Sequence, residues 1–310
     1  MANDPRSAIL GIDGGGTRTT AWLADAHGHV LGRSVAGPSN PVKVGIEAAE
    51  RELLLATRRA ARDARLAGGP LKVVCVGLAG VDRPAVYRGL SRWLRRAIPA
   101  GNHLLTSDAA IALQAAIGAR PGILVISGTG SIAYGHDATG QAARCGGWGS
   151  LFDDGGSGYD IGRKAIIAAL QAHDGRGRGT RLGAEICRTL RLKDITWIVL
   201  KPLAPHQIAA LFPLVLEAAR QRDAVARRLL DEAGRDLAEL ALALIRRFGW
   251  QRQAVAVVQA GGVFQASRRV RLSFELHVSK CAPLARFTTL QRPAVEGALM
   301  LARELPMADC

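Results

Sequence analysis

The sequence has few cysteines, and no two of them stand close together. The five are Cys75, Cys145, Cys187, Cys281 and Cys310. An odd number at wide spacings is not typical of a disulfide framework, and it lacks the paired spacing of a zinc site. We therefore expect a chain that works in a reducing, cytoplasmic environment.

Long apolar runs are also missing. No stretch approaches the roughly 18 consecutive apolar residues that a membrane-spanning helix needs. The segment from Met1 to Ser7 is polar and leads directly into a strand-like run, so it lacks the apolar centre of a signal peptide. These observations predict a protein with no membrane partner.

Aromatic residues make up only 5% of the chain, and the 26 acidic residues are outnumbered by 41 basic ones. The formal charge of +15 raises the hypothesis of a nucleic-acid-binding protein. However, the basic residues are mostly arginines in twos and threes, and no basic stretch is interleaved with aromatic side chains that stack on bases. We expect no nucleic-acid partner, but a solvated basic surface whose field gathers an anionic ligand such as a nucleotide.

The length of 310 residues is about twice that of a typical domain of roughly 150 residues. A hydrophobic share of 48% is enough for a sizeable core. Strand patterns alternate with helical ones, which predicts an α/β architecture. The predicted strands outside the two hairpins are 71–77, 103–107 and 254–259, and the predicted helices are 45–66, 84–98, 109–118, 157–173 and 293–305. Residues 179–190 and 205–248 are predicted to be mostly helical.

Each half of the chain opens with the same local pattern. A short apolar strand runs into a glycine-rich turn, a second strand follows, and a turn of the form Asp-x-x-Gly comes next. The pattern occupies residues 9–28 and again residues 123–140. It predicts a β-hairpin at the start of each half, and the two copies indicate a duplicated domain.

The two glycine-rich turns are candidate phosphate sites. Loop 1 is residues 14–17 (Gly14, Gly15, Gly16 and Thr17), and loop 2 is residues 128–131 (Gly128, Thr129, Gly130 and Ser131). Without Cβ atoms in the way, backbone N–H groups in such turns converge on phosphate oxygens, and the hydroxyl groups add further donors. Two such loops on matching hairpins could hold a polyphosphate between domains.

Other phosphate motifs are absent or lack their context. The sequence contains no G-x-x-x-x-G-K-[ST] and no H-R-D, which excludes a P-loop and a protein-kinase catalytic loop. Residues 128–133 match G-x-G-x-x-A after a strand, but the chain turns at 137–140 where a dinucleotide-binding fold needs a long helix.

Two aspartates stand where open α/β sheets place their ligands, at the carboxyl ends of apolar strands. Asp13 adjoins loop 1 and could hold Mg²⁺, through water, because Mg²⁺ keeps several water ligands. Asp108 precedes a predicted helix, so it either caps that helix or takes part in chemistry. The spacing alone favours neither role.

A second glycine-rich region lies between the second hairpin and the next helix. It contains CGGWG at 145–149 and DDGGSG at 153–158. Exposed backbone, one flat aromatic ring and a carboxylate suit a polyhydroxylated ligand. The alternative is a tight turn around a buried tryptophan.

Several of these motifs, taken together and in order, resemble one family. They are GIDGGGT (11–17), GPSN (37–40), SDAA (107–110), ISGTGS (126–131), CGGWG (145–149), DGGSG (154–158) and AGGV (260–263). The chain is similar to the ASKHA superfamily of actin, heat-shock ATPases and sugar kinases. Within it, the resemblance is to the N-acetylglucosamine kinase branch, which is grouped with the BadF/BadG/BcrA/BcrD ATPases.

The resemblance implies two RNase H-like, actin-type domains at residues 1–112 and 113–292, with ATP in the cleft between them and helix 293–305 packing back on the first. It implies the following roles: phosphate binding by loops 1 and 2, adenosine binding by Gly261 and Gly262, sugar binding by Asn40, Gly147, Trp148 and Asp154, and catalysis by Asp108, which also contacts the sugar. Family members are commonly homodimers.

The function implied is ATP- and Mg²⁺-dependent phosphorylation of the 6-hydroxyl of N-acetylglucosamine or glucosamine. One departure bears on the substrate. The family's usual Gly-Asp-Glu-Gly-Ser is Asp153-Asp154-Gly155-Gly156-Ser157 here. Kinases of N-acetylmuramate or glucose stay open as alternatives. A BadF-type activator of a dehydratase is a further alternative, although the scattered cysteines do not match its iron–sulfur site.

Overall fold

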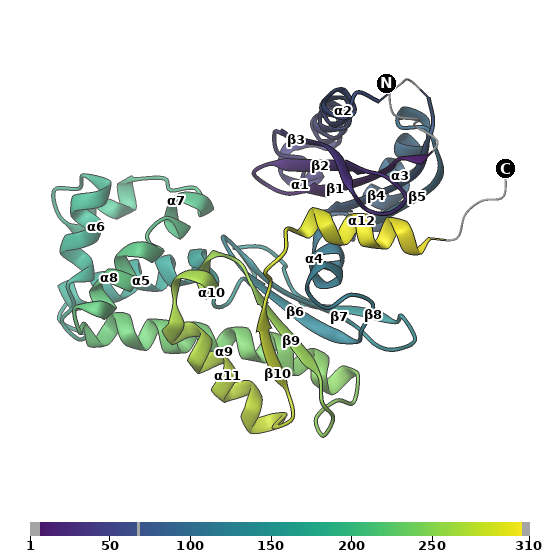
Figure 1. The fold of residues 1–310 in the computed structure, drawn as a ribbon. Helices are drawn as coiled ribbons and strands as arrows, with labels where there is room; N and C mark the ends of the chain where they lie inside the picture. The colour runs from purple at the N-terminus through teal and green to yellow at the C-terminus, as the bar shows by residue number, and fades with distance from the viewer. Residues whose placement is uncertain (1–6, 67–68, 306–310) are drawn as a thin grey trace. The chain divides into compact units, whose positions relative to one another are not determined.

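The computed structural model describes residues 7–66 and 69–305, which form two compact units (Figure 1). Unit 1 is built from the described parts of Met1–Arg120 and Leu290–Cys310, and unit 2 is Pro121–Thr289. Residues 1–6, which bear on the predicted lack of a signal peptide, and Cys310, one of the five cysteines, lie outside the described residues. No helix within the described ranges has the length and apolar character needed to span a bilayer.

Unit 1 contains a five-stranded sheet in the order β3-β2-β1-β4-β5. Strands β1, β2 and β3 are antiparallel neighbours, whereas β1, β4 and β5 run parallel. Its elements are β1 (Ile9–Gly14), β2 (Thr19–Ala24), β3 (Val30–Ala36), α1 (Pro41–Val44), α2 (Ile46–Asp63), β4 (Leu71–Leu78), α3 (Pro84–Ala97), β5 (Ala100–Thr106), α4 (Asp108–Ile117) and α12 (Ala294–Glu304).

Alternating side chains of the β1 and β4 strands serve two separate cores, because successive residues of a strand point to opposite faces. Leu10 and Val74 belong to the core formed with α2 and α3. Ile9 and Val73 belong to the core formed with α4 and α12. Unit 1 is therefore a sheet covered by helices on both faces.

Helix α12 lies very close to α4. A Cβ atom added to Gly297 would stand 1.9 Å from the Ile111 carbonyl oxygen, so only glycine permits this approach. The predicted domain boundary after residue 112 falls inside α4, which unit 1 contains whole. The packing of α4 against α12 gives the reason, because it ties the helix to unit 1 as far as its end.

Unit 2 repeats the sheet of unit 1 in the order β10-β9-β6-β7-β8. Again three strands are antiparallel (β6, β7, β8) and three are parallel (β6, β9, β10). Its elements are β6 (Gly122–Ser127), β7 (Ser131–His136), β8 (Ala142–Gly146), α5 (Gly158–His173), α6 (Leu182–Leu190), η2 (Ile195–Leu200), α7 (Pro205–Ala209), α8 (Phe212–Arg220), α9 (Ala224–Arg247), β9 (Ala256–Ala260), α10 (Gly262–Ala266), α11 (Arg268–Cys281) and β10 (Arg286–Thr289).

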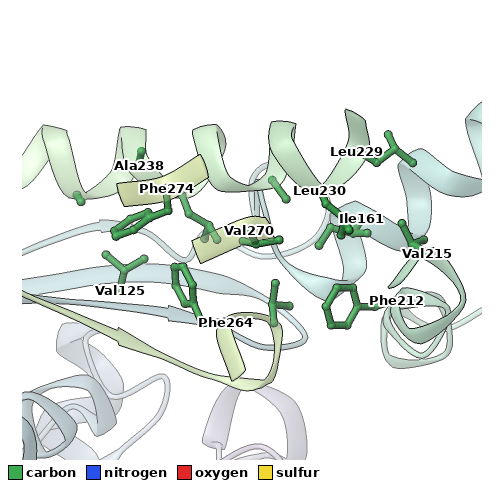
Figure 2. Packing of buried hydrophobic residues seen from close by; sticks show 14 of the residues in the cluster. Val125, Ile161, Phe212, Val215, Leu229, Leu230, Ala238, Phe264, Val270 and Phe274 are labelled. Carbon is green, nitrogen blue, oxygen red and sulfur yellow. The ribbon is translucent and has the colours of Figure 1, made fainter. Parts of the chain in front are cut away.

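The core of unit 2 lies between its sheet and its helices, as Figure 2 shows. Val125 of β6 packs with Phe264 of α10 and Phe274 of α11, whose rings meet edge to face with centroids 5.1 Å apart. Helix α9 contributes a long row of small and aliphatic side chains that includes Leu230 and Ala238. This core holds β6 and β9 in place, so that the loops at their carboxyl ends are fixed.

Both predicted hairpins are present, as β1–β2 and β6–β7. The sequence pattern predicts no element for β3, α1, β8, η2, α10, α11 or β10. Three of these are sheet edges or next to them, and their alternation is weak; β10, for example, is largely exposed. Edge strands need little apolar surface, so a hydrophobic pattern is a poor guide to them.

Candidate active site

The carboxyl ends of three parallel strands meet at one edge of the sheet in unit 1. The pairing register puts Asp13 of β1 beside Gly77 of β4, and Gly77 beside Thr106 of β5. Asp108 follows β5 directly, and the turn that contains Asp82 follows β4. The structure thus brings the two predicted aspartates to the same edge and adds a third carboxylate.

Asp108 is not the cap of α4. Ser107 takes that place, because its Oγ accepts the Ala110 N–H (3.1 Å), and Asp108 is the first residue of the helix. Its Oδ1 accepts the Ala109 N–H (2.9 Å). Burial raises the pKa of Asp108 to about 6, and the negative charges of Asp13 and Asp82 add to the rise. A carboxyl group with such a pKa is a suitable proton acceptor near neutral pH.

Asp13 is perturbed in the same direction. Burial raises its pKa to about 6, and the positive charge of Arg18 partly opposes the rise. No hydrogen bond reaches the Asp13 carboxylate from residues 7–66 or 69–305. A partly buried carboxylate without hydrogen-bond donors is poorly stabilised when ionised, so a cation beside it would offset the cost of burial.

Loop 1 is fixed by its own backbone and by the chain before α1. The Gly15 N–H donates to the Arg18 carbonyl (2.9 Å), and the Gly15 carbonyl accepts the N–H groups of Ser39 (3.0 Å) and Asn40 (3.2 Å). A Cβ atom on Gly14 would stand 2.6 Å from Ser39 Oγ, so this approach requires glycine.

These bonds narrow the predicted phosphate site. Within the described chain, the N–H groups of Gly16 and Thr17 form no hydrogen bond, and neither does the Thr17 hydroxyl. Loop 1 therefore offers two adjacent backbone donors and one hydroxyl group, while Gly15 maintains its shape.

Of the two polar atoms of the Asn40 side chain, the oxygen already has a hydrogen-bond partner. Its Oδ1 accepts the Val42 N–H (3.0 Å) and so caps α1. A Cβ atom on Gly80, in the turn after β4, would stand 2.7 Å from the same oxygen. The Nδ2 group has two protons to donate, so Asn40 is suited to donate a hydrogen bond to a ligand rather than to accept one.

Lys43, three residues after Asn40, is a residue that sequence reasoning missed. Its Nζ lies 3.1 Å from the point where a Cβ atom on Gly16 would stand. The signal available was Pro41 at the start of a helix, which predicts that positions 40 and 43 lie on neighbouring turns. An exposed lysine in a basic chain gives no other sign of function.

Loop 2 is supported from another part of the chain, residues 154–159. Asp154 Oδ1 accepts the Ser131 N–H (3.0 Å), and the Ser131 hydroxyl donates to the Gly155 carbonyl (2.8 Å). The N–H groups of Gly158 and Tyr159 donate to the carbonyls of loop 2. The Gly128 N–H is used as well, by the Gly130 carbonyl.

The donors still available in loop 2 are therefore the N–H groups of Thr129 and Gly130 and the Thr129 hydroxyl, which form no hydrogen bond within the described residues. Ser131, a predicted phosphate ligand, is buried. Its N–H donates to Asp154 and its hydroxyl to the Gly155 carbonyl, so neither donor remains for a phosphate. Loops 1 and 2 thus each present two adjacent open backbone N–H groups and one open hydroxyl group.

The predicted sugar residues of unit 2 lie on the chain between β8 and α5. Asp154 is buried and has a positive φ of 72°. Gly147 also has a positive φ, of 73°. Trp148 is 66% exposed, with the Arg144 guanidinium 4.4 Å from its ring centroid. The alternative of a turn around a buried tryptophan is therefore wrong, because the ring lies at the surface beside a cation.

The predicted adenosine residues lie beside loop 2. Strands β6 and β9 are parallel neighbours, with Ile126 opposite Ala260, so Gly261 follows β9 where Ser127 ends β6. A Cβ atom on Gly261 would stand 2.2 Å from the Ser127 carbonyl oxygen, and its φ is 95°. Gly262 begins α10 and has open space beside it.

The predicted residues therefore form two groups. Unit 1 brings together loop 1, Asp13, Asn40 and Asp108, and unit 2 brings together loop 2, Asp154, Gly261 and Gly262. The four described cysteines are free thiols. Residues 7–66 and 69–305 contain no cluster of three or more His, Cys, Asp or Glu side chains arranged to hold a metal ion by themselves.

Known proteins resemble the chain over nearly its whole length. It is 34% identical over 299 residues to the N-acetylmuramic acid/N-acetylglucosamine kinase of Clostridium acetobutylicum, covering 95% of this chain and 98% of that protein. It is 29% identical over 272 residues to the N-acetyl-D-glucosamine kinase of Dictyostelium discoideum, covering 83% of this chain and 85% of that one.

The fold has solved counterparts. A protein of Chromobacterium violaceum, assigned provisionally as an N-acetylglucosamine kinase, superposes with a TM-score of 0.79 at 28% identity, covering 96% of this chain and 99% of that one. The two five-stranded sheets have the actin-like ASKHA fold of sugar kinases, as the sequence predicts. The model of the BadF/BadG/BcrA/BcrD ATPase family matches residues 10–302. The chain belongs to the BadF/BadG/BcrA/BcrD ATPase family.

Proposed function

We propose that the protein is an ATP-dependent kinase that phosphorylates the 6-hydroxyl of an amino sugar, N-acetylglucosamine or glucosamine. The observation that carries the proposal is Asp108, a carboxylate with a raised pKa at the same sheet edge as loop 1. The relatives named as amino-sugar kinases support the choice of substrate class.

In the proposed reaction, Asp108 accepts the proton of the sugar 6-hydroxyl while that oxygen bonds to the γ-phosphorus of ATP and the bond to ADP breaks. A pKa of about 6 leaves Asp108 ionised at neutral pH, yet basic enough to take up a proton as the bond forms. Phosphoryl transfer depends mainly on positioning and on stabilising charge, so an oriented carboxylate is a sufficient base.

The charge that spreads over the phosphate oxygens would be stabilised by the open donors of the two loops. These are the N–H groups of Gly16 and Thr17 in loop 1 and those of Thr129 and Gly130 in loop 2. Such donors are held in place before the reaction, which is the arrangement that stabilises a transition state most. Gly261 and Gly262 would contact the adenosine.

The residues present fit a magnesium ion shared with ATP. Mg²⁺ binds proteins through one or two carboxylates and completes its shell with water and substrate phosphates. Asp13 is one partly buried carboxylate without hydrogen-bond donors in the described chain, beside loop 1. Asp13 would hold the ion, through water, and the ion would neutralise phosphate charge.

The sugar would be held by Asn40, through its free Nδ2 group, together with Asp108, Gly147, Trp148 and Asp154. Gly155 stands where the family's usual loop has glutamate, and a Cβ atom there would approach Asp236 at 3.3 Å. Without that glutamate, the hydroxyl groups of the sugar lose one carboxylate that could accept their hydrogen bonds. N-acetylmuramate and glucose therefore belong in any substrate test.

Two parts of the proposal concern the protein as a whole, a homodimer and a cytoplasmic location. Light scattering during size-exclusion chromatography measures the first. The alternative function, an ATPase that activates a dehydratase, requires an iron–sulfur cluster. A brown, cluster-containing protein purified without oxygen would favour that alternative over the kinase.

The test is a panel of N-acetylglucosamine, glucosamine, N-acetylmuramate and glucose with ATP and Mg²⁺, followed by ADP release. We expect release that depends on an amino sugar, with the phosphate found on the 6-oxygen of the product by NMR. ADP release at the same rate with and without every sugar would contradict the proposal.

A further inference from the structure

Lys43 is held over loop 1 by the way α1 is attached. The Gly15 carbonyl binds the N–H groups of Ser39 and Asn40, so α1 begins against the loop. The Lys43 side chain then lies along Gly16, with its Cδ, Cε and Nζ at 3.3, 3.6 and 3.1 Å from the place of a Cβ atom on that glycine. The stem can lie there because Gly16 has no side chain.

The Lys43 ammonium has no carboxylate partner in residues 7–66 and 69–305. Glu47, four positions later, does not pair with it. The ammonium instead lies beside Gly16, whose open N–H group is followed by that of Thr17, so a positive charge and two backbone donors belong to the same loop. Such a spot suits a compact anion with several oxygen atoms.

The position of Asn40 indicates which anion would bind beside Lys43 and loop 1. Asn40 and Lys43 are the cap and the third residue of the same short helix, so the proposed sugar donor and the ammonium beside Gly16 belong to one short stretch of chain. In the proposed reaction, the group that passes between a sugar hydroxyl and the remaining ADP is the γ-phosphoryl group. We propose that Lys43 contacts that group and stabilises its charge during transfer.

The step keeps Lys43 chemically unchanged. The sugar oxygen forms a bond to phosphorus, the bond from phosphorus to the β-phosphate oxygen breaks, and the hydroxyl proton passes to Asp108. Lys43 retains its three protons and supplies only charge and hydrogen bonds. This role rests on the proposed function, because it assumes that ATP is the phosphate donor.

The test compares wild type with Lys43→Met, which keeps the length of the stem and removes the charge. We expect kcat to fall on the order of 10²-fold, the usual cost of removing one charge-stabilising donor, with little change in the KM for the sugar. Binding of a non-hydrolysable ATP analogue should weaken about tenfold, a loss of roughly 1.4 kcal/mol, while ADP binding stays unchanged.

Two variants serve as controls. Lys43→Arg keeps the charge and should recover most of the lost kcat. Lys280→Met removes an exposed lysine from α11 of unit 2 and should match wild type in every measurement. A Lys43→Met enzyme with wild-type kcat, or equal losses in analogue and ADP binding, would overturn the assignment. If no sugar is phosphorylated, the proposed function fails by itself, and the two binding measurements still decide the role of Lys43.

Discussion

Loops 1 and 2 occupy equivalent places in two sheets of the same order, yet they are built differently. Loop 1 closes on itself through Gly15 and Arg18, and carboxylates and cations surround it. Loop 2 is supported by residues 154–159, which take up the N–H and hydroxyl of Ser131. Each copy of the hairpin therefore leaves two backbone donors open, but among the described residues the carboxylates with a raised pKa belong to unit 1.

The difference predicts that the two copies of the hairpin have different roles. In unit 1, Asp13, Asp108 and Lys43 put titratable charge next to the loop, at a cost in stability when carboxylates are buried. In unit 2, the loop is fixed by the hydrogen bonds that the N–H and hydroxyl of Ser131 donate to Asp154 and Gly155. Loss of the Asp108 carboxylate in unit 1 should thus affect the chemical step most, whereas loss of the Ser131 hydroxyl in unit 2 should affect mainly folding.

The largest effect is expected from Asp108→Asn. Asparagine keeps the shape but cannot accept the hydroxyl proton, so sugar-dependent ADP release should fall by 10²- to 10⁴-fold, roughly the contribution of a general base. The control is Asp174→Asn, an exposed aspartate of unit 2 that pairs with Arg176. Near-wild-type turnover of Asp108→Asn would remove the chemical distinction between the two units.

The pH dependence gives the next largest effect. Asp108 must be ionised to act as a base, and its pKa is about 6, so kcat/KM should drop towards tenfold per pH unit below about pH 6. Because the charge of Asp82 helps to raise that pKa, Asp82→Asn should move the acid limb to lower pH. A limb that stays in place in Asp82→Asn would show that the two carboxylates are not coupled.

A matched pair of hydroxyl deletions compares the two loops directly. Ser131→Ala removes the bond to the Gly155 carbonyl and should lower the free energy of unfolding by about 1 kcal/mol, measured in urea. Thr17→Ala removes a hydroxyl that forms no hydrogen bond in the described chain, so it should leave stability unchanged and raise the KM for ATP a few-fold. The reverse pattern would assign phosphate binding to Ser131 and a structural role to Thr17.

The smallest effect concerns the stability of unit 1. The pKa of Asp108 is higher in the folded protein than in the unfolded chain, so folded Asp108 holds its proton more tightly, and its contribution to stability declines as pH rises from about 4 to about 6. Above that window, the ionised, partly buried carboxylate destabilises the fold.

Asp108→Asn should therefore raise the melting temperature at pH 7.5 by about 2–4 °C, corresponding to about 1 kcal/mol after allowance for solvent screening. At pH 4 the gain should vanish, since Asp108 is then neutral in wild type as well. Scanning calorimetry at the two pH values measures both. Equal gains at both values would mean that the charge of Asp108 is not the cause.

Much of this framework could be predicted from local sequence. The apolar runs before loops 1 and 2 define the two hairpins, and the aspartates at strand ends mark the edge where ligands bind. The sequence alone is compatible with two roles for Asp108, a helix cap and a chemical one. The structure decides that it does not cap α4, because Ser107 does.

What could not be predicted depends on contacts between distant parts of the chain. The open donors of loop 1 follow from the bonds between Gly15 and residues 39–40, and those of loop 2 follow from the bond between Ser131 and Asp154. For Lys43, Pro41 indicates only a short helix, and it is the fold that brings the lysine ammonium to Gly16. Residue types therefore indicate phosphate binding at the two loops. The long-range hydrogen bonds of Gly15 and Ser131 determine which N–H and hydroxyl groups remain available to bind the phosphate.

The position of α12 has a consequence for how the protein is made. Leu299 and Ala302 of this last helix complete a core whose other members, such as Ile9 and Val73, are synthesised first. During translation, the strands of unit 1 leave the ribosome with part of one face of their sheet uncovered, because α4 is already made but α12 follows only after the continuous segment of unit 2. Unit 2 can thus finish folding before unit 1 does, although unit 1 contains the earlier residues, and the uncovered face is the part of the nascent chain that most needs protection from aggregation.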